Sequence, residues 1–141
     1  MKYWLLKTEP EEWSWNDQVK CALKGSIWDG VRNFQARNNL KMMSIGDKCF
    51  FYHTGKEKKI VGIVKVIKEY FPDKSDSTKN FGSIMVRSHK KIKLPVSLKD
   101  IKKQSLLGHL SLIKQSRLSV ISIDSKSWKI ICKMGKINYQ I

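Results

Sequence analysis

The run Ile60-Val61-Gly62-Ile63-Val64 lies near the middle of the chain and contains no polar side chain. A continuous apolar run with several β-branched residues is typical of a strand that is buried on both faces. Residues 48–54 and 59–71 share this β-branched and aromatic character, and only the short polar stretch 55–58 separates them. This spacing predicts an antiparallel hairpin at the centre of the fold.

Further strands are expected on both sides of this hairpin. Tyr3-Trp4-Leu5-Leu6 is a short apolar run, and Pro10 ends it in a turn because proline cannot continue a central strand. Residues 83–96 alternate between apolar and polar side chains, which predicts one long strand or two shorter ones. Residues 72–82 are rich in turn-forming residues, so we expect a mobile loop there that can border a site.

Capping residues indicate short helices between and after the strands. Ser14 or Asn16 can cap a helix that runs to about Leu23, and Ser97 can cap one that ends at Lys103. A loop then leads to residues 117–121. Asp124 is expected to cap a last helix before Gly135, with these side chains inward: Ile123, Trp128, Ile131 and Cys132. The pattern as a whole predicts an α+β fold in which the central strands close into a small β-barrel flanked by short helices.

Residues 31–43 are free of Gly and Pro and are expected to form a helix. Its buried stripe would consist of Ala36, Leu40 and Met43. Asn33 and Arg37 are four residues apart on a neighbouring face, so the helical spacing predicts that both point at one target. Residues 26–30 before the helix are expected to be a loop that carries Trp28.

Length and composition restrict the class of protein. A chain of 141 residues forms one ordinary domain, and 41% hydrophobic residues suffice for a real core. No apolar run is long enough for a membrane span and no signal peptide is visible, so we expect a cytoplasmic monomer with no membrane partner. The three cysteines and three histidines are scattered, which predicts buried free thiols and neither a metal nor another cofactor.

The charge is the first indication of a partner. There are 28 basic residues against 12 acidic ones, a net charge of +16, which favours a polyanion such as DNA or RNA. Only 4 of the 28 basic residues are arginines, and an AT-rich coding sequence would produce the other 24 as lysines without selection for binding. Two interpretations therefore stay open, a functional basic face and a compositional excess of lysine.

The sequence shows no catalytic machinery. There is no nucleophile elbow, and the phosphate loops GxxxxGK[ST] and GxGxxG are absent. The acidic group Glu9, Glu11 and Glu12 is typical of a solvated first helical turn. A binding pocket has better support, because six residues supply stacking rings, guanidinium groups and an amide: Trp28, Arg32, Asn33, Arg37, Tyr52 and Tyr70.

Several segments together resemble one known family. In chain order they are Tyr3 to Pro10, Trp28 to Asn39, Gly46-Asp47, Phe51-Tyr52-His53-Thr54, Gly62-Ile63 with Val66, Tyr70 to Asp73, Pro95 to Leu98 and Arg117 to Val120. The chain resembles the EVE domain family of the PUA-like superfamily over nearly its whole length. The resemblance implies a β-barrel with short helices and a pocket that receives one flipped, modified, cytosine-type base of a nucleic acid.

The same resemblance implies roles for particular residues. Trp28 and Tyr52 would wall the pocket. The rim and the remaining lining would come from Lys7, Thr8, Glu9, Asp29, Val31, Arg32, Asn33, Arg37, His53, Tyr70, Arg117, Leu118, Ser119 and Val120. An enzyme that acts on a modified base or nucleotide, with Glu9 or His53 as acid or base, is the alternative to this non-catalytic reading. A protein-interaction adaptor is a third class.

Overall fold

The computed structural model describes residues 1–138. Within this range, these elements follow one another: β1 (Tyr3–Thr8), α1 (Trp15–Lys20), the 3₁₀ turn η1 (Ala22–Lys24), β2 (Ser26–Trp28), α2 (Phe34–Lys41), β3 (Lys48–His53), β4 (Lys59–Pro72), β5 (Gly82–Ser97), α3 (Leu98–Lys102), the 3₁₀ turn η2 (Ser105–Leu107), α4 (Ser111–Lys114), β6 (Val120–Ile123) and α5 (Ser125–Met134). The expected α+β character, the central hairpin of β3 and β4, and the long strand β5 are confirmed.

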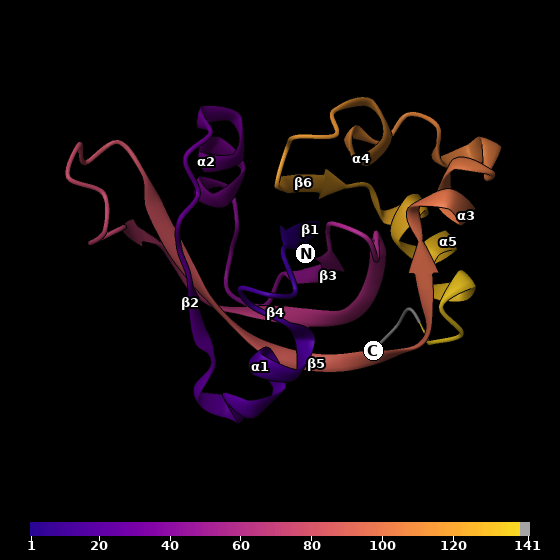
Figure 1. Cartoon of the computed structure of the whole chain (residues 1–141), viewed down its shortest axis with the longest axis horizontal. Coiled ribbons are helices and arrows are strands. Elements are labelled where there is room, and N and C mark those ends of the chain that lie inside the picture. Colours follow the sequence, from indigo (N-terminus) through magenta and orange to yellow (C-terminus); the bar gives the residue numbers. More distant parts are fainter. Residues whose placement is uncertain (139–141) are drawn as a thin grey trace.

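The six strands form one curved sheet in the order β2-β5-β4-β3-β1-β6. All neighbours are antiparallel except β1 and β3, which run parallel. The long strands β4 and β5 change register at several points, and such irregularities bend and twist a sheet. The sheet therefore wraps around the core in a barrel-like shape, with short helices at its rim (Figure 1). It is not closed, because no pairing joins the edge strands β2 and β6 in the part that is described.

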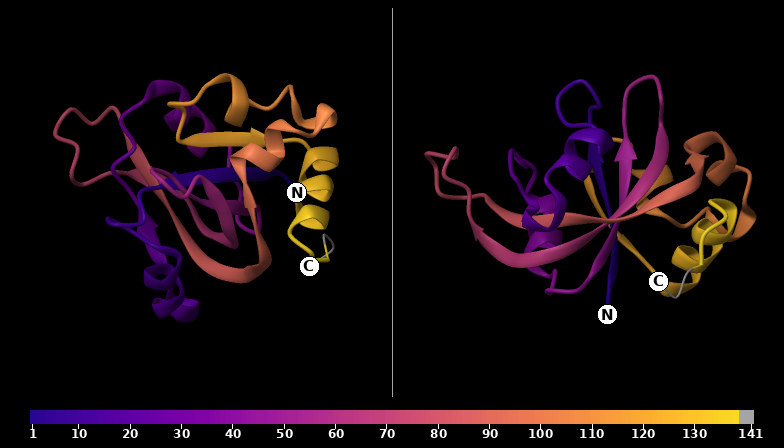
Figure 2. Two further views of the ribbon diagram at one scale, coloured as in Figure 1. Left: turned by 45° about the vertical axis from the view of Figure 1, so that its right-hand side comes forward. Right: turned by 90° about the horizontal axis from the view of Figure 1, so that it is seen from below.

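A stack of three rings fixes the last helix to the sheet. The Trp128 ring lies between Phe50, at 3.9 Å between ring centroids, and Tyr3, at 4.5 Å. The Asp124 side chain caps α5 by accepting a hydrogen bond from the Ser127 N–H. Figure 2 shows α5 beside the bend of β5. The cap and the inward positions predicted for this helix are confirmed.

The other predicted caps are confirmed with small changes in length. Ser14 forms a capping box with Asp17, and α1 ends at Lys20 before η1 completes the turn to Gly25. Ser97 caps α3 by accepting from the Asp100 N–H. Each cap satisfies a backbone N–H that the first turn of a helix leaves without a partner.

Two local predictions on the segment before α2 are wrong. Residues 26–30 are not entirely loop, because Ser26–Trp28 form β2 and pair with β5, Trp28 opposite Ile84. The helix starts at Phe34 and not at residue 31, because Asn33 has extended backbone angles and serves as the N-cap, accepting from the Ala36 N–H. The predicted stripe of this helix is buried as expected: Ala36, Leu40 and Met43.

The glycine in the central strand has a packing reason. The Trp15 ring lies against Gly62, and a Cβ at this position would collide with the ring. Trp15 also packs edge-to-face on Phe51, at 5.3 Å between centroids. Gly62 therefore allows α1 to dock closely on the sheet.

The sequence also predicts that the chain has no membrane span, no metal and buried free thiols. Within residues 1–138, no helix is long and apolar enough to cross a membrane. In the same range, no cluster of His, Cys, Asp and Glu side chains could hold a metal ion. Cys49 and Cys132 are buried free thiols, as predicted, and burial raises the pKa of Cys132 to about 12. Cys21 is only partly buried, because it lies at the end of the surface helix α1.

Candidate functional site

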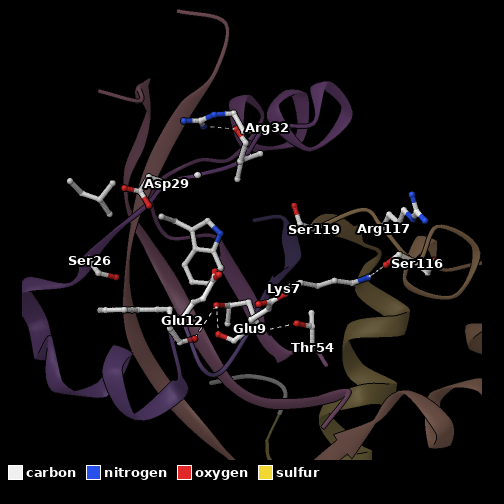
Figure 3. Close-up of a pocket in the computed structure, with 16 residues that line it drawn as sticks. Lys7, Glu9, Glu12, Ser26, Asp29, Arg32, Thr54, Ser116, Arg117 and Ser119 are labelled. Carbon is white, nitrogen blue, oxygen red and sulfur yellow. Dashed lines mark hydrogen bonds between the residues drawn. The ribbon is translucent and has the colours of Figure 1, made fainter. Parts of the chain in front are cut away.

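An open cavity of about 910 Å³ lies at one end of the curved sheet. Four parts of the chain surround it: the end of β1 with the turn that follows, β2 with the segment leading to α2, the start of the β3–β4 connection, and the segment before β6. The lining residues are 7–9, 12, 13, 26–32, 54, 116, 117 and 119. Figure 3 shows their side chains gathered around a common space.

The turn after β1 is fixed by hydrogen bonds. The Thr8 hydroxyl donates to the Trp13 carbonyl at 2.9 Å, and the Thr8 carbonyl accepts from the Thr54 N–H at 2.9 Å. The Trp13 N–H closes the turn on the Glu9 carbonyl, while the Trp13 ring N–H donates to Gln18 at 2.9 Å. These contacts hold Thr8, Glu9 and Trp13 in the cavity wall.

Trp28 lines the cavity as the last residue of β2. Its ring packs edge-to-face on Phe51, at 5.6 Å between centroids and an interplanar angle of 81°, and only 8% of the residue is exposed. Val31 beside it is buried as well. A ring held in this way presents a fixed apolar surface to the cavity, and an aromatic surface of this kind can stack on a planar ligand.

Charged groups of both signs line the cavity. In Figure 3, Lys7 reaches toward Ser116 and Arg117 on one side, Arg32 lies above, and the carboxylates Glu9 and Glu12 lie below. Asp29 occupies the remaining side. Within residues 1–138, the salt bridges Arg32–Asp73, His53–Glu57 and His109–Asp124 leave out Glu9, Glu12 and Asp29. Cations and carboxylates on different walls can therefore orient a polar ligand.

Lys7 is the most enclosed cation of the site. Its Nζ donates to the Ser116 carbonyl at 3.0 Å and lies 5.8 Å from the centroid of the Tyr52 ring. Burial lowers the pKa of the Lys7 ammonium below its usual value. The contact with Ser116 also ties β1 to the segment before β6, where Arg117 and Ser119 line the cavity.

Arg32 joins the cavity to the loop between β4 and β5. Its guanidinium donates to Asp73 at 2.9 Å and to the Ser75 hydroxyl at 3.0 Å. Burial of Asp73 by itself raises the pKa of that carboxyl, but hydrogen bonds from Ser75, Arg32 and the Gly30 N–H outweigh it and hold the pKa well below its usual range. Asp73 is therefore a charged anchor for Arg32.

The structure does not bring Asn33 and Arg37 to one target. Asn33 is the N-cap of α2, with an extended backbone and a side chain that accepts from the Ala36 N–H, so its side chain does not share a helical face with Arg37. Neither residue lines the cavity. The Arg37 guanidinium instead donates to the Asn80 carbonyl at 3.2 Å and to the Asn38 side chain. Neither side chain is therefore part of the cavity wall, and a contact of either residue with a ligand stays a prediction.

Two β3 residues expected at the pocket are enclosed in the core. Tyr52 is 3% exposed and lies behind Lys7, and burial raises the pKa of its hydroxyl to about 12. His53 is also buried, and its Nε2 accepts from the Trp15 N–H at 3.0 Å while Nδ1 lies 3.0 Å from a Glu57 oxygen. Since Nε2 is an acceptor, Nδ1 carries the proton and donates to Glu57. Neither residue lines the cavity.

Three more expected residues lie outside the cavity. Tyr70 lies against Gly82 on the hairpin of β4 and β5, with Lys41 above its ring. Leu118 and Val120 point into the core, at 4% and 0% exposure, because apolar side chains of the segment entering β6 alternate inward. Of the predicted pocket residues, these line the cavity: Lys7, Thr8, Glu9, Trp28, Asp29, Val31, Arg32, Arg117 and Ser119.

Sequence reasoning missed several lining residues. Glu12 and Trp13 belong to the turn after β1, Ser26 and Ile27 precede Trp28, Gly30 follows it, Thr54 follows β3 and Ser116 precedes Arg117. Trp13 could have been found from the sequence, because it directly follows acidic residues and belongs to no periodic apolar pattern that would place it in the core. The other six are ordinary residue types, and only the meeting of distant segments places them here.

The curved open sheet with a pocket at one end defines a PUA-like fold. The ASCH protein of Zymomonas mobilis has the same fold at a TM-score of 0.58 and 12% identity, over 94% of this chain and 95% of that one. The chain belongs to the EVE family, since the EVE domain model matches residues 2–134. This finding confirms the resemblance noted in the sequence.

Solved structures similar to this chain come from bacteria and from human. Atu2648 of Agrobacterium tumefaciens is 40% identical with a TM-score of 0.93, covering 97% of this chain and 94% of that one. Human THYN1 protein, solved in complex with DNA that contains 5-methylcytosine, is 27% identical with a TM-score of 0.85 over 98% and 99% of the two chains.

A sequence comparison leads to the same relatives. Human thymocyte nuclear protein 1 is 41% identical over 88 residues, which are 55% of this chain and 39% of that protein. The chicken protein of that name matches over 34% of its length. The chain thus spans less than half of the length of these curated relatives.

Proposed function

We propose that this chain is a non-catalytic nucleic-acid-binding module whose cavity accepts one flipped, modified, cytosine-type base. The cavity between Trp28 and the Lys7 side of the site is the observation that carries the proposal, because it combines a fixed aromatic wall with charged groups. Extruding a base costs a few kcal/mol of stacking and pairing. Contact with an aromatic ring, at about 1–3 kcal/mol per base, can offset that cost.

The carboxylates of the cavity support an amino-bearing base. A carboxylate accepts hydrogen bonds and gives none, so it favours the N4 amino group of cytosine over the O4 carbonyl of thymine or uracil. Glu9, Glu12 and Asp29 are such acceptors at the wall, and no hydrogen bond within residues 1–138 uses their carboxylate oxygens. The DNA in the complex of the human relative contains 5-methylcytosine, which supports the same class of base.

The cations support contact with the phosphates on either side of the base. Lys7, Arg32 and Arg117 lie around the cavity, and the whole chain carries a net charge of +16. Arginine and lysine position a nucleic acid through its phosphate oxygens without reading its sequence. The base identity would then be read inside the cavity.

The arrangement of His53 supports a non-catalytic role. General acid–base catalysis needs a group within hydrogen-bond reach of the substrate. Both ring nitrogens of His53 are engaged with Trp15 and Glu57, and the residue lies outside the cavity. His53 is therefore not placed to act with Glu9 on a ligand in the cavity, as the enzymatic alternative would require of it.

A binding titration tests the proposal. Oligonucleotides that carry one 5-methylcytosine, and their unmodified twins, are compared as DNA and as RNA at one fixed salt concentration. We expect the modified oligonucleotide to bind more tightly in at least one of the two backbones. Equal affinity for modified and unmodified oligonucleotides contradicts a pocket for a modified base, and turnover of a modified nucleoside detected by chromatography contradicts the non-catalytic role.

A further inference from the structure

An aromatic surface with arginines lies beside the cavity but is not part of it. The rings of Phe34 and Phe81 lie 5.0 Å apart at an interplanar angle of 31°, and the Arg37 guanidinium lies 4.8 Å from the Phe34 centroid. We call these three residues the Phe34 platform. Phe34 is 55% exposed although it is the first residue of a helix with a buried face. A large exposed ring of this kind can provide a binding surface.

The platform begins where the cavity wall ends. Arg32 lines the cavity, and its guanidinium lies 5.6 Å from the centroid of the Phe81 ring. The Gly30 N–H, also at the cavity, donates to Asp73 in the same loop that carries Phe81. Cavity and platform are therefore neighbouring parts of one surface.

The loop that carries Phe81 is held in shape by two buried carboxylates. Asp73 accepts from the N–H and the hydroxyl of Ser75, and Asp76 accepts from the backbone N–H groups of Thr78, Asn80 and Phe81. The loop projects from the sheet beside α2 (Figures 1 and 2). Phe81 is thereby positioned before any ligand arrives, which lowers the entropic cost of binding.

The charge around the platform suits an anion. Within residues 1–138, Arg37 forms no salt bridge, and its guanidinium donates its hydrogen bonds to neutral oxygens of Asn38 and Asn80. Lys74 and Lys79 of the loop are exposed, whereas Asp73 and Asp76 are buried and used as acceptors inside the loop. Exposed cations next to an aromatic ring are the usual combination for binding single-stranded nucleic acid.

We propose that the Phe34 platform binds the nucleotide next to the flipped base, with the neighbouring base stacked on Phe34 and its phosphate near Arg37. This inference rests on the proposed function, because a base in the cavity brings its covalently linked neighbour to the adjoining surface. The platform adds affinity that does not depend on whether the flipped base is modified. The platform thereby gives the protein a second contact with the same nucleic-acid strand.

Fluorescence anisotropy with short single-stranded DNA tests this arrangement. One oligonucleotide has a central 5-methylcytosine, the other has cytosine, and both are titrated at one salt concentration. Phe34→Ala should weaken binding of both by the same factor, roughly 5- to 150-fold, which is the usual effect of losing one stacked base. The affinity ratio between the two oligonucleotides should stay as in the parent.

Two control variants accompany Phe34→Ala. Phe34→Tyr keeps an aromatic ring and should retain most of the parent's affinity. Leu106→Ala removes another exposed apolar side chain, 58% exposed, from η2 beside α3 on the far side of the molecule, and should bind as the parent does (Figure 1). Thermal melting of all three confirms that they fold.

The outcomes separate this inference from the proposed function. If Phe34→Ala binds as tightly as the parent, the platform has no role in binding. If the variant loses the affinity ratio, Phe34 acts inside the pocket and a separate platform is wrong. If the parent shows no ratio while Phe34→Ala still weakens binding, the platform stands and the modified-base pocket fails. A parent that binds neither oligonucleotide overturns both.

Discussion

The Arg32 guanidinium lies 2.9 Å from the Asp73 carboxylate, and the two residues are 41 positions apart in the chain. The ion pair connects the segment between β2 and α2 with the loop between β4 and β5. Asp73 is buried, whereas the Arg32 side chain is 40% exposed, so the pair combines a fixed anion with a cation that still faces the cavity. Arg32 thus has a structural role and a place in the candidate site.

Replacing Arg32 by lysine should affect both roles. Lysine keeps the charge but cannot form the guanidinium fork that reaches Asp73 and Ser75 together. We expect the free energy of unfolding to fall by about 1–2 kcal/mol, since hydrogen bonds to a charged group are lost at a partly exposed position. Urea denaturation measures this change. Arg117→Lys is the control, and an equal loss of stability there would contradict a specific role of the Asp73 pair.

Trp28 should contribute to binding through its ring. Trp28→Leu keeps an apolar side chain but removes the stacking surface, so affinity for an oligonucleotide with 5-methylcytosine should fall roughly 5- to 150-fold. Trp28→Phe should lose less. Because Trp28 is buried against Phe51, the free energy of unfolding should also fall, and affinity is therefore compared at a temperature where each variant is folded.

Trp15→Leu is a matched control for this experiment. Trp15 is as buried as Trp28 and packs on the same ring of Phe51, at 5.3 Å, but it does not line the cavity. This variant should lose stability and keep its affinity. If both variants lose affinity alike, the effect comes from displacement of Phe51 and not from a base stacked on Trp28.

The parts of the fold that the sequence predicted are those with local signals. The hairpin of β3 and β4 follows from two β-branched segments joined by four polar residues, and α5 follows from the cap at Asp124 and its apolar spacing. β2 was missed because its three residues have no strand pattern of their own. They form a strand only because β5, more than fifty residues later, provides the backbone partners.

The candidate site was partly predictable, because some of its residues also have a local signal in the sequence. Trp28 and Arg32 belong to a polar cluster too dense for a helix that only packs, and both line the cavity. Asn33 and Arg37 do not point at one target as predicted, because Asn33 is an N-cap with an extended backbone and its side chain does not lie on the helical face of Arg37. No sequence pattern predicts that Arg32 pairs with Asp73, because the pair forms only when segments 41 residues apart meet in the fold.

His53 should stabilise the fold without taking part in binding. His53→Ala leaves the buried Trp15 N–H without its acceptor, and an unsatisfied buried donor costs about 1–3 kcal/mol. We expect urea denaturation to show this loss, and oligonucleotide affinity to stay unchanged at a temperature where the variant is folded. A variant with normal stability and lost affinity would place His53 in the functional site.

Stability should fall as the pH is lowered from about 4 toward about 2. Burial of Asp124 by itself raises its pKa, but hydrogen bonds from His109 and Ser127 outweigh this and lower the pKa from 3.8 to about 2. The native state therefore binds fewer protons than the unfolded state in this range, and the stabilising effect is lost as the pH drops through the folded-state pKa. In urea denaturation at several pH values, Asp124→Asn should show a shallower decline. A decline as steep as the parent's would assign the acid sensitivity to other carboxylates.

The salt dependence of binding should distinguish a functional basic face from a compositional excess of lysine. If cations at the cavity contact phosphates, the logarithm of the affinity falls linearly with the logarithm of the salt concentration, and each contact contributes about 0.7 to the slope for a single-stranded nucleic acid.

Arg117→Gln removes an exposed cation at the cavity and should lower the slope by about that amount. Lys99→Gln removes an exposed cation from α3, on the far side of the molecule, and should leave the slope as in the parent (Figure 1). Equal slopes for all three proteins would show that Arg117 contacts no phosphate, and a flat response of the parent would show that the net charge of +16 has no part in binding.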